Sequence, residues 1–296
     1  DLMKRVQAFS GITFFEKTGI LRPALTEELA EDFSRSPNKY DWPDSNWIKW
    51  IEKSQFKESY AYVGENYGGL ILPNGYTVNT PLYIKHLSDY LISRGLDARF
   101  RADTSVKKTS TGTYIISLSN GSEIEADKVV YATGSSVKDD PIWNFLPFKT
   151  TKGQLLDLLF ESAPAIDHSI SSMGYFAYQP SEPNRLVVGS TYEHSYSDMK
   201  TDDDGKEYLY KKLNRTLPGL PDKPHTVSMW SGERVSTQDH KPAIGAHPSM
   251  KGLFLLCGLG SKGMIQGRYL AEKLADLMLL DKPIENQFNL NRFLNA

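Results

Sequence analysis

The sequence has 296 residues, 40% of them hydrophobic and 11% aromatic, with a formal net charge of −2 and one cysteine, Cys257. This is the composition of a globular chain long enough for two domains. A single cysteine excludes an intrachain disulfide scaffold and favours a reducing compartment, and the small net charge gives no broad attraction for nucleic acid. No run approaches the roughly 20 apolar residues of a membrane helix. We therefore expect a cytoplasmic protein without a membrane partner.

The start of the chain has the character of the middle of a helix. Residues 2–9 carry a helical pattern, and the first residue is Asp rather than Met. No secretory signal is recognisable. We therefore expect the chain to begin inside a larger protein or to have been trimmed.

The first third of the sequence consists of short elements divided by turns. We expect strands at 11–15, 18–21 and 68–72, and helices from Thr26 and from about Asn79 to Arg94. Asn79 or Thr80 caps the second helix, because Pro81 fits its first position. The tryptophans at 42, 47 and 50 have helical spacing in their second half, which is typical of a core or interface face; an aromatic substrate wall is the alternative.

Strand signals dominate from residue 98 to residue 230. We expect strands at 98–101, 105–107, 114–119, 123–125, 128–132, 155–160, 175–179, 185–191 and 226–230, and one helix at 205–216. Asn120-Gly121 between alternating strands is a strong hairpin signal. The acidic run at 202–204 is expected to be a solvated loop, because it lacks the spaced partner ligands of a metal site.

The C-terminal part carries the most informative pattern. A buried strand at 252–257 runs into Gly258-Leu-Gly260-Ser-Lys-Gly263, and a helix follows from Met264 to about Leu280. Strand, glycine loop and helix form an element of dinucleotide-binding folds, in which glycines let a ligand approach the backbone. The second parallel strand and acid of a pyrophosphate site do not follow. The loop therefore contacts another part of a cofactor, or it is a structural turn.

Four motifs in order resemble the FAD-dependent oxidoreductases of the D-amino-acid oxidase and glycine oxidase type. The last motif combines G-x-R, at Arg234, with T-x-D-x-x-P-x-I-G at 237–245 and the glycine loop. The others lie at 69–78, 126–134 and 152–155. The resemblance covers about residues 19–293. The glycine loop also resembles that of the flavin domain of tRNA wobble-uridine modifying oxidoreductases.

The resemblance implies an α/β fold of mixed α+β character, with a Rossmann-like FAD domain interleaved with a substrate domain on a mixed β-sheet. It assigns 67–139 and 233–296 to the FAD domain, and 1–66 and 140–232 to the substrate domain. The family's N-terminal glycine-rich segment, which binds the FAD pyrophosphate, has no counterpart in the sequence. We expect an N-terminally incomplete FAD domain, whose missing part either lies outside this sequence or is absent from a truncated form that does not bind FAD.

The resemblance also implies site residues. Arg234 matches the arginine that pairs with a substrate carboxylate, and Lys262 lies where relatives carry Arg, Lys or another residue near the flavin; these are the expected catalytic residues. A surface or ion-paired arginine is the alternative for Arg234. The expected cofactor-binding residues are Val106 at the adenine, Ala132, Thr133 and Gly134 at the phosphate and ribose, and Gly258, Leu259, Gly260, Ser261, Lys262, Gly263 and Met264 at the flavin ring.

Several other side chains have a structural interpretation. Cys257 lies in an apolar run and is expected in the core. The six histidines lack metal-ligand spacing, so no metal is expected. Tyr175, Tyr178 and Tyr192 fit aromatic positions on strand faces, with a substrate pocket as the alternative.

The implied activity is hydride transfer from the carbon of a C–N bond in a small amine or amino acid to FAD, which gives an imine that hydrolyses. A flavin-free binding or partner module on the same fold is one alternative. A tRNA-modifying oxidoreductase is another, although the net charge of −2 shows no basic entrance for tRNA. The substrate, the electron acceptor and the oligomeric state are left open.

Overall fold

A computed structural model describes residues 2–220 and 224–294. Residues 1, 221–223, 295 and 296 belong to the expected domains but lie outside the described residues. The chain divides into two compact units. Unit 1 comprises residues 1–98, 153–192 and 200–231, and unit 2 comprises residues 99–152, 193–199 and 232–296. Each unit is assembled from three chain segments. The assignment of FAD and substrate roles to particular ranges stays a prediction, because compactness does not report which part binds a ligand.

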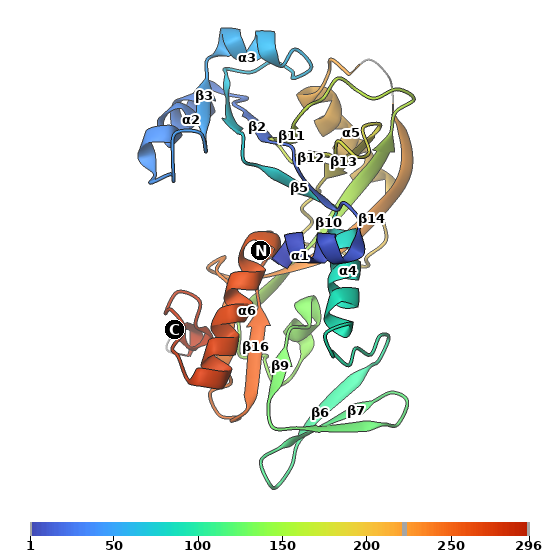
Figure 1. Cartoon of the computed structure of the whole chain (residues 1–296), viewed down its shortest axis with the longest axis vertical. Coiled ribbons are helices and arrows are strands. Elements are labelled where there is room, and N and C mark those ends of the chain that lie inside the picture. Colours follow the sequence, from blue (N-terminus) through green and yellow to red (C-terminus); the bar gives the residue numbers. More distant parts are fainter. Residues whose placement is uncertain (1, 221–223, 295–296) are drawn as a thin grey trace. The chain divides into compact units, whose positions relative to one another are not determined.

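Unit 1 is built on a mixed sheet. The strand order is β14-β10-β13-β12-β11-β2-β4-β3, and the pairs with described register are antiparallel except β11 with β2, which is parallel (Figure 1). The strands are β2 (Ile20–Pro23), β3 (Lys49–Ile51), β4 (Gly69–Leu72), β10 (Phe148–Leu159), β11 (Ser169–Ser171), β12 (Tyr175–Tyr178), β13 (Arg185–Gly189) and β14 (His225–Thr237). The long strands β10 and β14 each contribute residues to both units. The mixed sheet is thus confirmed.

Local capping signals account for the helices of unit 1. They are α1 (Leu2–Ser10), α2 (Glu27–Lys39), α3 (Lys53–Ser59), α4 (Thr80–Ile92) and α5 (Asp203–Thr216), and a separate pair of strands is formed by β1 (Phe15–Lys17) and β5 (Tyr76–Val78). Thr26 caps α2 and Asn79 caps α4, each by accepting a hydrogen bond from a backbone amide of the first turn. The sheet and α5 enclose a core that includes Leu156, Val188 and Leu209.

Trp42 and Trp50 pack against a core cluster, which agrees with the expected core face, although Trp50 lies in strand β3 despite the helical spacing. Two other local expectations for unit 1 and its neighbouring segment were wrong. No strand forms at 98–101, where Arg101 has a φ of 54°, outside the extended region. Asp202 is not in a solvated loop: it caps α5 by accepting from the amide of Gly205 at 2.7 Å, and it also accepts from the Gln154 amide. Acidic side chains at this position stabilise the helix, because its N-terminus carries the positive end of the helix dipole.

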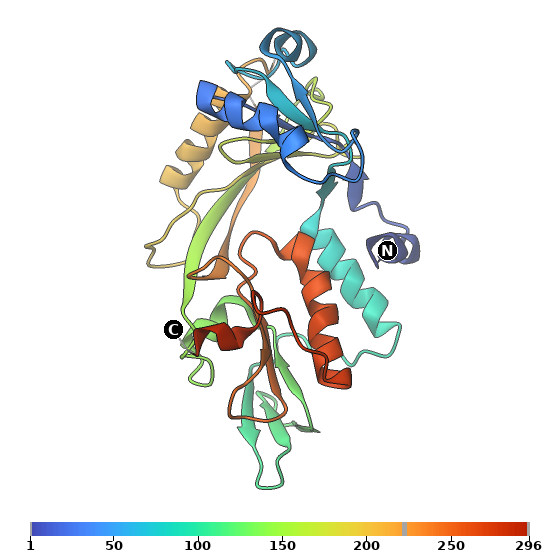
Figure 2. The same cartoon turned by 90° about the vertical axis from the view of Figure 1, so that its left-hand side faces the viewer.

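Unit 2 contains two small sheets. In one, β16 (Leu253–Cys257) lies between antiparallel β15 (Ala243–Ala246) and parallel β9 (Val129–Tyr131). The other is the antiparallel sheet of β6 (Thr104–Lys108), β7 (Tyr114–Leu118) and β8 (Glu123–Ala126), seen from a second direction in Figure 2. The Asn120-Gly121 hairpin is confirmed between β7 and β8, with Gly121 at a φ of 81°.

The strand β16 separates two cores in unit 2. Leu253, Leu255 and Cys257 face a cluster around Trp143. The alternate residue Phe254 faces α6 (Gly263–Leu280), which lies along the strand (Figure 1). This alternation is the pattern of a strand covered on both faces. Two short 3₁₀ helices, η1 (Gly134–Asp139) and η2 (Leu290–Phe293), complete the unit.

Within the described part of the chain, no helix has both the length and the apolar character needed to cross a bilayer.

Candidate functional site

The parallel pairing of β9 and β16 brings two distant segments to one edge of a sheet. Leu255 pairs with Tyr131, so both strands end at the same side. The Cys257 thiol donates to the Gly134 carbonyl oxygen at 3.4 Å. The turn at 132–134 and the glycine loop at 258–263 therefore lie together, at the carboxyl ends of parallel strands where open α/β sheets bind ligands.

The backbone of this edge carries three glycines with positive φ. Gly134, Gly258 and Gly260 have φ values of 62°, 75° and 53°. A Cβ on Gly134 would meet nothing within 4 Å, and a Cβ on Gly260 would meet only Ser236 Cβ at 3.7 Å. At Gly258 the space is tighter, with Thr237 Cγ2 at 3.2 Å. A ligand can therefore approach the main chain at Gly134 and Gly260, whereas Gly258 serves the turn itself.

The glycine loop delivers the chain to the N-terminus of α6. Lys262 is the N-cap residue and makes no side-chain cap hydrogen bond; its Nζ donates instead to the His240 carbonyl oxygen at 3.5 Å. The first amides of a helix have no partner inside the helix, and they carry the positive end of its dipole. This helix end can accept a group of negative charge, and Gly263, as the first helical residue, leaves the approach open.

Arg234 lies on the strand next to the glycine loop. The Gly260 amide donates to the Val235 carbonyl oxygen at 2.9 Å, and Ser236 forms an isolated antiparallel bridge with Leu259. Val235 is buried in the Trp143 core, so Arg234, which is half-buried, points to the other face of β14. The structure thus gathers Arg234, Lys262, the loop and the turn at 132–134 within one unit.

Val106 is placed differently from the other expected cofactor residues. It lies on β6, in a separate sheet, and packs half-buried against the core that contains Tyr114 and Tyr131. Its role at an adenine stays a prediction that this packing does not address.

Two residues near the signature have clear structural roles. Cys257 is buried in the core as expected, and burial raises the pKa of its thiol to about 11. The His247 ring lies 3.1 Å from the Ile142 carbonyl oxygen through Nε2, and Nδ1 is near the Met250 amide. In the described ranges 2–220 and 224–294, no group of three His, Cys, Asp or Glu side chains could hold a metal.

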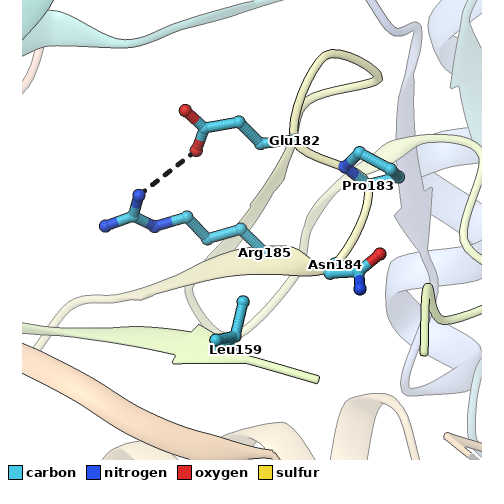
Figure 3. Close-up of a pocket in the computed structure, with 5 residues that line it drawn as sticks. All are labelled: Leu159, Glu182, Pro183, Asn184 and Arg185. Carbon is cyan, nitrogen blue, oxygen red and sulfur yellow. Dashed lines mark hydrogen bonds and ion pairs between the residues drawn. The ribbon is translucent and has the colours of Figure 1, made fainter. Parts of the chain in front are cut away.

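A shallow pocket in unit 1 lies between the turn from β12 to β13 and the end of β10. Its lining residues are Leu159 and the turn residues from Glu182 to Arg185 (Figure 3). Arg185 donates from Nε to Asp157 at 2.7 Å and pairs with Glu182 at 3.3 Å. The hydrogen bond to Asp157 raises the pKa of the guanidinium. Its charge is therefore neutralised by carboxylates of the turn and of the neighbouring strand β10, which marks a structural ion pair rather than a substrate site.

A second, polar pocket of about 260 Å³ lies in unit 2 and was not expected from the sequence. It is lined by Ser135, Lys138, Asp139, Thr150, His194, Ser195, Tyr196 and Glu233. Burial alone would raise the pKa of Glu233, but hydrogen bonds from Ser135, Tyr196 and Thr150, with the charge of Lys138, hold that pKa below its usual range. Glu233 directly precedes Arg234, and this adjacency was the one available sequence signal.

The comparisons with known proteins agree with this architecture. A family model described as FAD dependent oxidoreductase matches residues 1–277, and the chain belongs to this family. A solved glycine oxidase from Geobacillus kaustophilus has a TM-score of 0.84 at 22% identity, over 99% of this chain and 78% of that one. This likeness confirms the expected mixed α/β fold.

Two curated relatives illustrate the range of the family. The chain is 24% identical over 282 residues to the tRNA 5-methylaminomethyl-2-thiouridine biosynthesis bifunctional protein MnmC of Idiomarina loihiensis, covering 91% of this chain and 45% of that protein. It is 32% identical over 164 residues to the glycine oxidase of Pseudomonas aeruginosa, covering 55% and 44%. The chain thus spans less than half the length of these relatives.

Family membership implies FAD, and the edge described above fits part of that cofactor. The main chain is open at Gly134 and Gly260, and the uncapped start of α6 offers amides to negative charge. Both features are what an anionic, planar group lying against a backbone requires. The residues present therefore fit the group at the expected turn and loop.

Proposed function

We propose that this protein oxidises the C–N bond of a small amino acid, with FAD held at the turn 132–134 and the loop 258–264. Arg234 would bind the substrate carboxylate, since a guanidinium fork matches a carboxylate with two parallel hydrogen bonds. The observation that carries the proposal is the 2.9 Å hydrogen bond from Gly260 to Val235, which fixes the arginine strand to the loop.

The roles of this chain's residues follow from their positions. Arg234 orients the α-carbon of the substrate by holding its carboxylate. The amides at the start of α6 and the Lys262 ammonium stabilise negative charge at the loop. Bound FAD supplies the hydride acceptor. The substrate loses a hydride and a proton to become an imine, which water hydrolyses to a carbonyl compound and ammonia, or methylamine from an N-methyl substrate.

The test is reduction of the FAD-loaded protein by candidate substrates without oxygen. Glycine, N-methylglycine and D-alanine are added anaerobically to the holoprotein, and the visible flavin band is followed. We expect bleaching with at least one of them and none with Arg234→Ala at the same concentration. A protein that takes up FAD but is reduced by no amino acid contradicts the substrate class. A protein that takes up no FAD supports a flavin-free binding module instead.

A second candidate substrate is an amine carried on tRNA. It is favoured by the similarity to MnmC over 91% of this chain. Binding of tRNA would be dominated by phosphate contacts and would weaken steeply with salt. Gel-shift titration with unmodified and modified tRNA at two salt concentrations separates this candidate from free amino-acid oxidation, because a free amino-acid oxidase shows no salt-dependent tRNA complex.

A further inference from the structure

We propose that Glu233 is a positioning residue, whose half-buried hydrogen-bond cluster fixes the strand segment that presents Arg234. The proposal rests on the function proposed above, because it concerns how the substrate-binding arginine is held. Glu233 is the variable position of the G-x-R motif, so the motif itself assigns it no role. Its importance follows from its contacts in the folded chain.

Hydroxyl groups from three other segments lie around the Glu233 carboxylate, and that of Tyr196 donates a hydrogen bond to it. Ser135 comes from η1, Thr150 from β10, and Tyr196 from the segment that follows β13. The Tyr196 hydroxyl is also hydrogen-bonded to Thr150 Oγ1 at 2.7 Å. Hydrogen bonds to a charged acceptor are about twice as strong as neutral ones. This carboxylate therefore ties four separate segments of unit 2 together.

The position of Glu233 on β14 links the cluster to Arg234. Successive side chains of a strand point to opposite faces, so Glu233 and Val235 face the core side while Arg234 faces the other. On one flank of Arg234, the Glu233 side chain is anchored; on the other, the Val235 carbonyl oxygen accepts from Gly260 at 2.9 Å. The arginine is thus carried by a backbone segment fixed at both neighbours, which restricts where its guanidinium can lie.

The same cluster reaches the segment expected to lie at the cofactor. Ser135 directly follows Gly134, whose carbonyl oxygen accepts from Cys257. One carboxylate therefore couples the arginine strand to the turn at 132–134. Precise placement of this kind matters because a shift of about 1 Å in a binding group can cost on the order of 100-fold in rate.

The alternative role for Glu233 and its hydroxyl neighbours, binding a ligand in the polar pocket that they line, is less well supported. The Tyr196 hydroxyl is already hydrogen-bonded to Glu233 and to Thr150. These groups therefore hold chain segments together rather than being offered to a ligand. The geometry favours a structural clamp with a consequence at the arginine.

The experiment compares four variants of the FAD-loaded protein: Glu233→Ala, Tyr196→Phe, Arg234→Ala and Glu123→Gln. Glu123 is a matched control, a strand carboxylate in unit 2 that accepts from a single serine, Ser117, at 3.1 Å. Two quantities are measured: the KM and kcat for an amino-acid substrate, and the Kd of an unreactive carboxylate from its perturbation of the flavin spectrum. Thermal melting shows which variants are folded.

We expect Glu233→Ala to raise KM and the Kd of the unreactive carboxylate about 10-fold, or roughly 1.4 kcal/mol of binding free energy. The value of kcat should change much less. Tyr196→Phe should raise both KM and this Kd by about 3-fold, roughly half of that free-energy change, and it serves if Glu233→Ala does not fold. Glu123→Gln should match the wild type. If Arg234→Ala weakens the carboxylate while neither Glu233→Ala nor Tyr196→Phe does, the positioning role is overturned and the proposed function stands. If Arg234→Ala itself has no effect, the proposed function fails.

Discussion

The amide of Gly260 donates a hydrogen bond to the carbonyl oxygen of Val235 at 2.9 Å, and this contact joins the glycine loop to the strand of Arg234. The two segments come from separate motifs of the sequence. Their union places the backbone of Arg234 one residue from a loop that is open at Gly260 and leads to the start of α6. This combination supports the carboxylate-binding role proposed for the arginine.

Replacement of Gly260 by alanine should weaken FAD binding. At a φ of 53°, a residue with a Cβ is strained by roughly 1–2 kcal/mol, and the methyl group lies on the open face of the loop. We expect the Kd for FAD to rise about 10-fold, a change of roughly 1.4 kcal/mol. Gly121→Ala is the control, because Gly121 also has a positive φ, 81°, with nothing within 4 Å of an added Cβ. Equal losses of FAD affinity in both variants would contradict a local role.

The ion pair between Asp239 and Arg292 should make the free energy of unfolding depend on pH in the acid range. Arg292 donates to Asp239 from Nε at 2.8 Å and from Nη2 at 3.1 Å, and these bonds lower the pKa of the carboxyl far below its usual range despite partial burial. A lowered folded-state pKa gives stability that is present above the unfolded value of roughly 3.9 and lost as the pH falls toward the folded value. Since Asp239 is about a third exposed, we expect about 1 kcal/mol.

Urea unfolding of Asp239→Asn between neutral pH and the acid limit of the folded state measures this contribution. The variant should be less stable at neutral pH, and the difference from the wild type should shrink as the solution is acidified below about pH 4. Glu272→Gln, which removes the exposed 2.8 Å pair with Arg268, is the matched control and should change stability by less than about 0.5 kcal/mol. A difference that grows on acidification would contradict the assigned direction of the pKa shift.

The thiol of Cys257 should be unreactive in the folded protein. It is buried on β16, and burial raises its pKa to about 11, so the nucleophilic thiolate is scarce at neutral pH. Alkylation by iodoacetamide should be at least about 100-fold slower in buffer than in denaturant, in line with a thiolate fraction that falls tenfold per pH unit below the pKa. Rapid labelling of the native protein would show that the site is open to solvent.

The buried Lys152 should depend on Glu193. Its ammonium lies 3.4 Å from the Glu193 carboxylate, and the side chain is only 4% exposed. Glu193→Gln removes a carboxylate from beside a buried cation, and we expect it to lower stability by up to about 3 kcal/mol. The double variant Lys152→Met with Glu193→Gln should be more stable than Glu193→Gln alone when unfolding in urea is compared. A double variant that loses the sum of both single effects would contradict the coupling.

Much of the fold was predictable because its signals are local. Asn79 caps its helix, Gly121 completes its hairpin, and Gly263 begins the last helix, each within a few residues of the pattern that indicates it. The helical spacing of the tryptophans does not correspond to a helix at Trp50, because pairing with Leu70 on β4 decides its conformation. Local spacing carries no information about such a partner.

The candidate site likewise has one part that the sequence predicts and one part that it does not. The glycine loop and Arg234 are recognisable because their motifs are contiguous. The Glu233 cluster is not, since Ser135, Thr150 and Tyr196 lie 37 or more residues from it and meet only after the strands pair. The contact between Cys257 and Gly134 spans 123 residues and is equally invisible to local patterns.

The preference of the FAD-loaded protein for substrates with a carboxylate tests directly whether Arg234 binds that group. The ratio of kcat/KM for N-methylglycine to that for dimethylamine, which lacks the carboxylate, is measured for the FAD-loaded wild type and for Arg234→Ala. We predict that the wild type prefers the acid by about 30-fold or more, since a hydrogen-bonded charge pair contributes roughly 2–5 kcal/mol, and that Arg234→Ala loses most of this preference. A preference that persists in Arg234→Ala would show that another group binds the carboxylate and would contradict the account.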